Sequence, residues 1–301
     1  MSSRNANFPE NMDISPSTFE DNSKPHANHP FGYAAQRDAI EKYGIAGRIW
    51  EAAYLLSIYV NPPTEMEFDP PFIANPATSS SQCPLTILEL GSGAGMTSSR
   101  IAKNLDVHDM LIVTDLPEVC PLLERNLKAH ALLTVQSPPD PLILVRPLTW
   151  GTEFHGLAIA SERSQLLAPL LRSLLQVTSP PFSPPPSPMD PGVTVVISYK
   201  LRSLCKETPF WAVFGLWFTF APVLVNETSR GKGFWQRFGS SSEDTAFIFV
   251  AHRRPESYAW NTPTQDSDLL AGRGAMGNDS AKADDTFESL LFMTLEEPEA
   301  C

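Results

Sequence analysis

Two hydrophobic patterns with different periods alternate through the central part of the chain. A helix is expected over about 47–60, because apolar side chains recur there at helical spacing, at Ile49, Ala53, Leu56 and Val60. The apolar runs TILEL (86–90) and MLIVTD (110–115) are short and continuous instead, as in strands buried on both faces. Because residues 96–104 between these runs can be helical, the pattern predicts a β-α-β unit with parallel strands.

The same alternation of elements continues beyond residue 115. Helices are expected within 115–132 and over 164–176, and a helix or long turn over 207–218. Apolar runs that predict strands lie at 141–150, 194–202, 221–225 and 245–254. The sequence therefore predicts an α/β fold.

Both ends of the chain and one internal loop lack these patterns. Residues 1–30 are rich in Ser, Asn, Pro and Asp, and strand patterning is lost after His252. We expect a disordered leader at 1–30, one domain at 31–254 and an acidic disordered tail at 255–301. Within the tail, FESLLFMTL (287–295) is apolar enough to dock. Residues 179–191 hold seven prolines in thirteen positions, which predicts a stiff extended loop.

Charge and composition exclude several classes of protein. The tail contributes −8 and the leader −2 to the net charge of −12, so the domain between them is near neutral. This balance argues against nucleic acid and membrane surfaces as partners. No apolar run approaches the ~20 residues that span a bilayer. The four cysteines are far apart and the histidines are scattered, so neither a disulfide framework nor a metal site is expected. We expect a cytoplasmic, possibly also nuclear, protein.

A glycine-rich turn follows the first predicted strand of the β-α-β unit. Its glycines are Gly91, Gly93 and Gly95, whereas a dinucleotide-binding turn has the pattern G-x-G-x-x-G and needs glycine where Met96 stands. Glu89 precedes the turn and would repel a pyrophosphate, but it can attract the cationic amino-acid end of S-adenosylmethionine. This pattern favours S-adenosylmethionine over NAD, which stays a weak third hypothesis.

A second carboxylate strengthens this interpretation. Asp115 ends the next predicted strand, where it can accept hydrogen bonds from both ribose hydroxyls of a nucleoside. A lone glycine-rich turn is often a plain tight connection. With Glu89 before the turn and Asp115 after the second strand, a cofactor site is the better explanation.

Several motifs together resemble one family. ILELGSGAGMT, IVTDLPE, PLTWG and ISYKLRSLCKETPF, preceded by GRIWEAA, are similar to the seven-strand protein-lysine methyltransferases that modify non-histone proteins, over roughly 45–253. The resemblance implies a Rossmann-like sheet with strand order 3-2-1-4-5-7-6 and an antiparallel last strand. It also implies that Trp50, Gly91, Ser92, Gly93, Asp115 and Trp150 contact S-adenosylmethionine. We add Glu89 and Gly95 to this set.

One motif of the family is missing. An amine acceptor motif similar to D-x-x-Y is expected after the fourth strand, but HGLAIASERSQLLAPLL follows LTWG here. Either LAIAS is a degenerate fourth strand with Ser161 and Glu162 in the acceptor position, or a segment with that strand has been lost. We favour the loss, because HGLAIASE resembles a helical stretch more than a buried strand.

Other residues are candidates for the missing acceptor. Tyr199 could face the cofactor and Glu207 could approach the amine, although a capped core tyrosine is an equal alternative for Tyr199. The aromatic residues at 210, 211, 214 and 217 could line a lysine channel, but their spacing is more typical of a core. DPPF (69–72) and SPPF (179–182) match a motif of other methyltransferases at the wrong places in the fold, and we interpret both as linkers.

The sequence thus predicts an S-adenosylmethionine-dependent lysine N-methyltransferase that acts on a non-histone protein with an accessible lysine. The alternative is a catalytically impaired protein that binds S-adenosylmethionine or serves as an interaction module. We expect a monomer.

Overall fold

The computed structural model describes seven longer segments of the chain and two short stretches near the N-terminus. They are residue 8 and residues 13–17, 29–73, 84–133, 142–150, 164–187, 192–227, 234–239 and 245–295. The chain divides into two compact units, where one domain at 31–254 was expected. The first unit contains Met1–Thr149 and Asn226–Phe234, and the second contains Trp150–Val225 and Trp235–Cys301.

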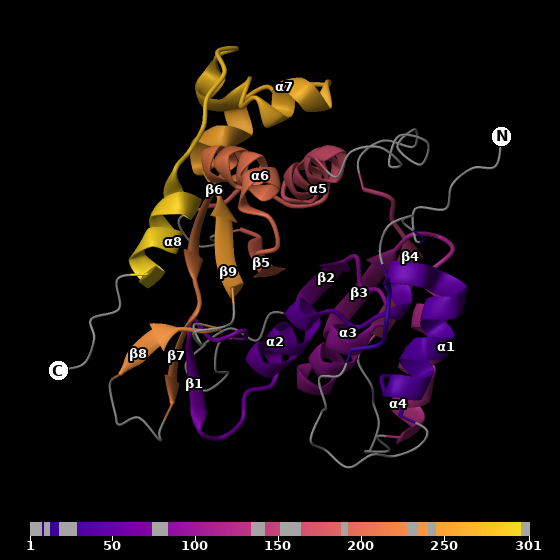
Figure 1. The fold of residues 1–301 in the computed structure, drawn as a ribbon. Coiled ribbons are helices and arrows are strands. Elements are labelled where there is room, and N and C mark those ends of the chain that lie inside the picture. Colours follow the sequence, from indigo (N-terminus) through magenta and orange to yellow (C-terminus); the bar gives the residue numbers. More distant parts are fainter. Residues whose placement is uncertain are drawn as a thin grey trace. The chain divides into compact units, whose positions relative to one another are not determined.

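The first unit is built on a parallel sheet of three strands (Figure 1). They are β2 (Thr86–Leu90), β3 (Met110–Asp115) and β4 (Leu142–Pro147), in the order β2-β3-β4. Leu88 pairs with Ile112, and Ile112 pairs with Leu144. Leu111 and Val113 of the central strand β3 are fully buried. The continuous apolar runs therefore correctly predict parallel strands, but buried residues are found only in β3: no residue of β2 is buried, and Leu88 is 37% exposed.

Helices of the first unit bury their apolar faces in two clusters that contain residues of this sheet and of the glycine turn. The helices are α1 (Tyr33–Tyr43), η1 (Gly44–Gly47), α2 (Glu51–Val60), α3 (Met96–Ile101), η2 (Ala102–Asn104) and α4 (Cys120–Leu133). The unit also contains strand β1 (Met66–Asp69).

The helix expected over 47–60 begins later, at Glu51. Two contacts explain the difference. A side chain at Gly47 would overlap the backbone of Ala39, so this residue is held in a tight 3-10 turn against α1. The backbone N–H of Ile49 donates to the side-chain oxygen of Gln36 at 3.1 Å, which holds the chain in an extended conformation before α2.

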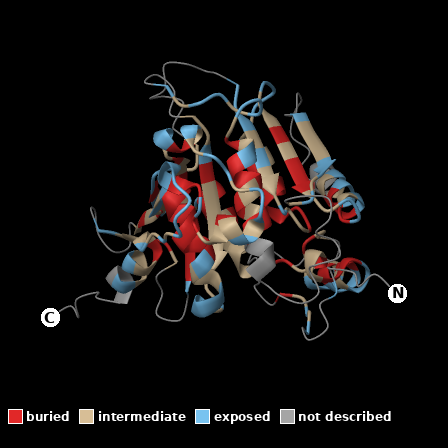
Figure 2. Cartoon of the chain, turned by 90° about the horizontal axis from the view of Figure 1, so that it is seen from above, coloured by how far each residue is buried: buried red, intermediate tan, exposed pale blue. Residues whose placement is uncertain are grey.

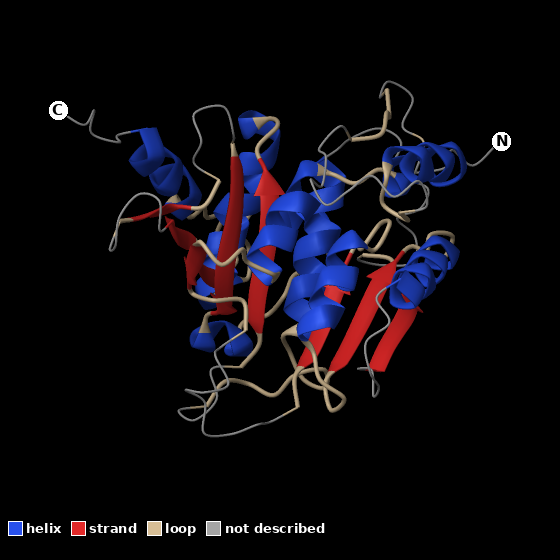
Figure 3. Ribbon diagram, turned by 90° about the horizontal axis from the view of Figure 1, so that it is seen from below, coloured by secondary structure: helices blue, strands red, loops and turns tan. Residues whose placement is uncertain are grey.

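The second unit contains an antiparallel sheet in the order β5-β9-β6. Its strands are β5 (Thr194–Lys200), β6 (Phe218–Pro222) and β9 (Ala246–Arg253), and β9 is antiparallel to both neighbours. Helices α5 (Ser164–Val177) and α6 (Leu204–Trp217) belong to this unit, and Figure 3 shows helices and strands by colour. The remaining strands are β7 (Leu224–Glu227) and β8 (Trp235–Arg237).

Each sheet reproduces part of the expected strand order. The first has the topology of strands 3-2-1, and the second has that of strands 5-7-6 with an antiparallel last strand. The mixed α/β structure with a parallel sheet is thus consistent with the Rossmann-like fold that the resemblance implies. The place of the fourth strand falls on residues 151–163, which lie outside the described residues, so its loss or degeneracy stays a prediction.

The aromatic side chains of α6 form a core. Phe210, Trp211, Phe214 and Trp217 are at most 3% exposed. Phe214 stacks on Phe218 with ring centroids 4.6 Å apart, and Trp211 lies 4.9 Å from Phe249 of β9. The choice of a core over a lysine channel for these residues is therefore confirmed.

The predicted disordered tail needs correction. Residues 255–295 form η5 (Pro255–Ala259), α7 (Asp266–Leu270), η6 (Ala275–Gly277) and α8 (Thr286–Leu295). Leu269 and Phe287 are fully buried, and Phe287 stacks on Trp211 at 4.8 Å. A few apolar side chains suffice here because they pack on a surface that α6 already provides, while most of the acidic side chains stay at least partly exposed. The suggestion that residues 287–295 dock agrees with this packing.

Burial differs between the described elements. Strands β3 and β9 hold several buried residues, whereas β2 and β4 hold none, and exposed residues occur both in connecting segments and on helices (Figure 2). Among the described helices, none has the length and the apolar character that crossing a membrane requires.

Candidate functional site

The candidate site lies where β2 and β3 end. Glu89 is the penultimate residue of β2, and Asp115 is the last residue of the adjacent strand β3. Because the strands are parallel and in register, both carboxyl groups belong to the same edge of the sheet. Ligands of open α/β sheets bind at this edge.

The glycine turn is fixed by backbone hydrogen bonds to β3. The Ser92 N–H donates to the Thr114 carbonyl at 3.0 Å, and the Gly93 N–H donates to Asp115 Oδ2 at 2.7 Å. Gly91, Gly93 and Gly95 all have positive φ values, of 68°, 54° and 84°. Side chains other than glycine are strained in this region, so the turn needs its glycines for conformation.

Close packing is a second reason why two of these positions need glycine. A side-chain carbon at Gly93 would lie 3.3 Å from the carbonyl oxygen of Ala46, and one at Gly95 would lie 3.0 Å from Leu123 of α4. The first contact places the turn beside the segment that leads into GRIWEAA. Two of the motifs that define the family resemblance are therefore neighbours in space.

The Glu89 carboxyl group is partly buried. Its hydrogen-bond partner is the Ser98 hydroxyl of α3. Burial raises the pKa of Glu89 to about 7, against the opposing effect of the Ser98 and Ser92 hydroxyls, and the negative charge of Asp115 adds to the rise. Glu89 is thus a carboxyl group that can gain or lose a proton near neutral pH.

Asp115 differs from Glu89 in its partners. Its Oδ2 accepts from Gly93 and its Oδ1 accepts from the Leu116 N–H, both at 2.7 Å. Burial raises the pKa of Asp115, and these two N–H donors oppose the rise. A carboxylate offers about four lone-pair positions, so Asp115 retains acceptor capacity beyond the two bonds it makes.

Trp50 occupies the position before the first residue of α2. Its Nε1 donates to the Ile45 carbonyl at 3.0 Å, and the Arg48 guanidinium lies 4.7 Å from the ring centroid. Arg48 is also held by Glu51 at 2.8 Å. The indole is thus fixed by its own motif, GRIWEAA, in the unit that holds the glycine turn.

Trp150 is half-buried and is the first residue of the second unit. The chain that leads to it is tied to the site, because the Leu148 N–H donates to the Asp115 carbonyl at 2.8 Å. The part played by Trp150 stays a prediction.

Tyr199 and Glu207 are brought together, as their joint candidacy requires, and both lie in the second unit. The Tyr199 hydroxyl donates to the Glu207 carboxylate, which also accepts from the backbone N–H groups of Arg202 and Ser203 at 3.2 and 3.3 Å. Burial and the Glu207 carboxylate raise the pKa of Tyr199. The pair caps the N-terminus of α6, and the Tyr199 ring packs edge-on against Trp211.

Three further residues support the site and were not singled out from the sequence. Ser98 binds Glu89, and Asn126 donates to the Ala94 carbonyl of the glycine turn at 2.9 Å. Gln36 joins three backbone groups: its amide donates to Phe31, and its oxygen accepts from Ser17 and Ile49. Lone polar residues in helices carry no sequence signal, because most of them face solvent.

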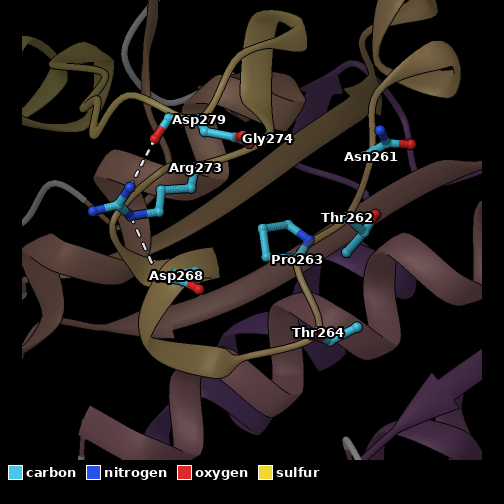
Figure 4. A pocket seen from close by; sticks show the side chains of 8 residues that line it. All are labelled: Asn261, Thr262, Pro263, Thr264, Asp268, Arg273, Gly274 and Asp279. Carbon is cyan, nitrogen blue, oxygen red and sulfur yellow. Dashed lines mark hydrogen bonds and ion pairs between the residues drawn. The ribbon is translucent and has the colours of Figure 1, made fainter.

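A cavity of about 380 Å³ lies elsewhere, within residues 261–279 of the second unit (Figure 4). Arg273 lies between Asp268, at 3.3 Å, and the Asp279 carbonyl, at 2.9 Å, so local partners already satisfy its charge. None of the predicted site residues lines this cavity.

The parallel sheet and the carboxylate-flanked glycine turn define the class as open α/β proteins that bind a ligand at the carboxyl edge of the sheet. Within this class, residues 34–168 match a family model described as lysine methyltransferase. The match confirms the resemblance to the protein-lysine methyltransferase family and supports a methyltransferase function. It spans α1 to the first residues of α5 and includes Trp50, the glycine turn, Asp115 and Trp150. A search of curated proteins found no match to the chain.

Proposed function

We propose that the protein transfers a methyl group from S-adenosylmethionine to a lysine side chain of a non-histone protein. The observation that carries this proposal is the bond between Gly93 and Asp115, which joins the glycine turn to the acidic end of the neighbouring strand. The family match supports the reaction class. We further propose that the protein acts as a monomer in the cytoplasm, possibly also in the nucleus.

The residues of the first unit fit this methyl donor. Gly93 has a positive φ and lies beside the carbonyl of Ala46. Because Gly93 has no side chain, its backbone is open to close approach by a ligand, and a side chain there would fill this space. Glu89 supplies a carboxylate for the cationic amino-acid end, and the spare acceptor positions of Asp115 suit two ribose hydroxyls. Trp50, Gly91, Ser92 and Gly95 complete the proposed binding set in this unit. Trp150, the first residue of the second unit, is added on the strength of the family resemblance. The bound donor supplies an activated methyl group.

A lysine amine must lose its proton before it can accept a methyl group, because its ordinary pKa is about 10.4. Tyr199 and Glu207 are the proposed acceptors of that proton. Glu207 is the better base of the two, because the raised pKa of Tyr199 keeps its phenol protonated at neutral pH. The Tyr199 hydroxyl in turn orients the Glu207 carboxylate.

One observation favours the second candidate, a catalytically impaired protein that binds S-adenosylmethionine. Oε2 of Glu207 already accepts hydrogen bonds from Tyr199, Arg202 and Ser203, so one of the two carboxylate oxygens is committed to partners within the protein. A base committed to capping a helix is a poor proton acceptor. The sequence also lacks a motif similar to D-x-x-Y after LTWG.

Calorimetric titration of the purified chain with S-adenosylmethionine tests the binding step that both candidates share. Incubation with methyl-labelled S-adenosylmethionine and a cell extract then tests transfer to protein lysines. Binding with label on lysine supports the enzyme, and binding without label supports the impaired protein. Failure of the folded chain to bind at millimolar concentration contradicts both, and binding of NAD instead would indicate an oxidoreductase.

A further inference from the structure

The loop that follows α5 is rich in proline and largely exposed. Its described part, residues 179–187, has the sequence SPPFSPPPS. Pro180, Pro181, Pro184 and Pro185 are exposed, and the Phe182 side chain is 64% exposed. The loop thus presents a largely exposed aromatic ring beside a run of exposed prolines.

The base of this loop is fixed to α5 by its serines. The Ser183 hydroxyl donates to the Val177 carbonyl at 2.8 Å, and the Ser183 N–H donates to the Ser179 carbonyl at 3.1 Å. Ser179 donates to the Leu175 carbonyl at 2.6 Å and accepts from the buried Arg253. Ser179 and Ser183 therefore face the protein, while the exposed residues of the loop include Phe182, Pro184 and Pro185.

Proline chemistry fixes the conformation of the outward part. Each proline ring holds φ near −65°, and a residue that precedes a proline is pushed out of the helical region. Both restrictions act on Pro184 and Pro185, and the second acts on Ser183. Residues 184–186 are accordingly in neither helix nor strand. Such a segment is extended, lacks N–H donors and loses little conformational entropy when it binds.

We propose that residues 182–187 form a docking ligand for a partner protein domain that binds polyproline II segments in an aromatic-lined groove. Prolines 184–186 supply the rigid segment, and Phe182 supplies an adjacent apolar anchor. The stretch 179–191 contains neither lysine nor arginine, so it offers no ion pair to a groove that is flanked by acidic side chains. The chemistry fits a neutral aromatic groove of the WW type. This inference does not depend on the proposed function.

The alternative is that the prolines only stiffen the connection between α5 and β5. The probes that separate the two are purified, isotope-labelled WW, EVH1 and SH3 domains, each titrated with the full chain and followed by NMR chemical shifts. We expect saturable shifts of the groove residues of a WW domain. The double substitution Pro184→Ala, Pro185→Ala should weaken that binding by about tenfold or more, and Phe182→Ala should weaken it less.

A matched control is the exposed Pro62, which belongs to a different diproline loop. Pro62→Ala should leave WW binding unchanged. Circular dichroism of each variant checks that the fold is retained, which is expected because the substituted side chains are exposed. The proposal is overturned if no WW domain saturates at about millimolar concentration, if only the SH3 or EVH1 domain binds, or if Pro62→Ala weakens binding as much as the double substitution.

Discussion

The backbone N–H of Gly93 donates a 2.7 Å hydrogen bond to Asp115, the carboxylate proposed to hold the ribose of the donor. The bond joins two segments that are 22 residues apart in the sequence. One side chain therefore shapes the glycine turn and also offers acceptors to a ligand. Folding of the turn and ligand binding share this carboxylate, and their mutational effects should be linked.

Gly93→Ala should destabilise the protein by about 1–2 kcal/mol, because alanine is strained at a φ of 54°, and it should abolish binding of S-adenosylmethionine. Urea unfolding and calorimetric titration measure the two effects. Gly277→Ala is a matched control, since Gly277 has a φ of 70° and no atom within 4 Å of an added side chain. The control should show the strain without the loss of binding, and equal binding loss in both variants would contradict the prediction.

Asp115→Asn should lower the free energy of unfolding by about 1–3 kcal/mol, because one backbone N–H then faces an amide nitrogen instead of an acceptor. Binding of S-adenosylmethionine should fall as well. Asp109 provides a control of the same chemistry, since it accepts from the N–H groups of Leu85 and Asp106 at 2.7 and 2.9 Å. Asp109→Asn should destabilise the fold and leave binding intact.

Glu89 should make both stability and binding depend on pH. Its pKa rises from an ordinary value of 4.5 to about 7 on folding, chiefly through burial, so the folded protein holds this proton more tightly than the unfolded chain. The stabilising contribution is fully present below pH 4.5 and is lost as pH rises through 7, with a loss of about 3 kcal/mol. Binding of the cationic donor should strengthen over the same range, because the carboxylate form is favoured.

Glu89→Gln removes the titrating group and should remove both pH effects. Denaturant unfolding and calorimetry between pH 5 and about 8 measure them as differences from the unsubstituted chain. The exposed Glu118 is the control, and Glu118→Gln should keep both pH dependences. A Glu89→Gln protein with an unchanged pH profile would show that this carboxyl group does not titrate in the expected range.

Tyr199→Phe separates a catalytic role of the Tyr199–Glu207 pair from a purely structural one. The loss of one hydrogen bond to a carboxylate should cost about 1–3 kcal/mol of stability and leave donor binding unchanged. If Glu207 accepts the amine proton, kcat should fall and its pH profile should shift, because the carboxylate loses its orienting hydroxyl. A variant that is less stable but has an unchanged kcat would assign the pair to helix capping alone.

Phe287→Ala should destabilise the second unit by about 3–5 kcal/mol, because the ring is fully buried against Trp211. Phe292 lies on the same helix with 66% of its side chain exposed, so Phe292→Ala should change stability by less than about 0.5 kcal/mol. Thermal unfolding of the two variants checks the contrast. Equal, small effects would restore the disordered tail predicted from the sequence.

The parts of the fold that local pattern determines could be predicted. The apolar runs of β2 and β3 mark strands by themselves, although only β3 holds buried residues, and the glycine turn with Glu89 and Asp115 follows from where those strands end. The start of α2 could not be predicted, since Gln36 binds Ile49 across thirteen positions of sequence. The apolar character of residues 287–295 indicated that they could dock, but the surface that receives Phe287 could not be predicted, because it is made by Trp211 of α6 and not by neighbours in sequence.

Because Glu207 caps α6, we expect it to be retained in evolution even if selection for catalysis is lost. The same carboxylate secures Tyr199 and two peptide groups, so drift at this position is penalised through folding whether or not any substrate is ever modified. An acidic residue at position 207 in descendants of this sequence would accordingly be weak evidence of catalytic activity. Enzymatic assays of those descendants are needed to decide whether they are active.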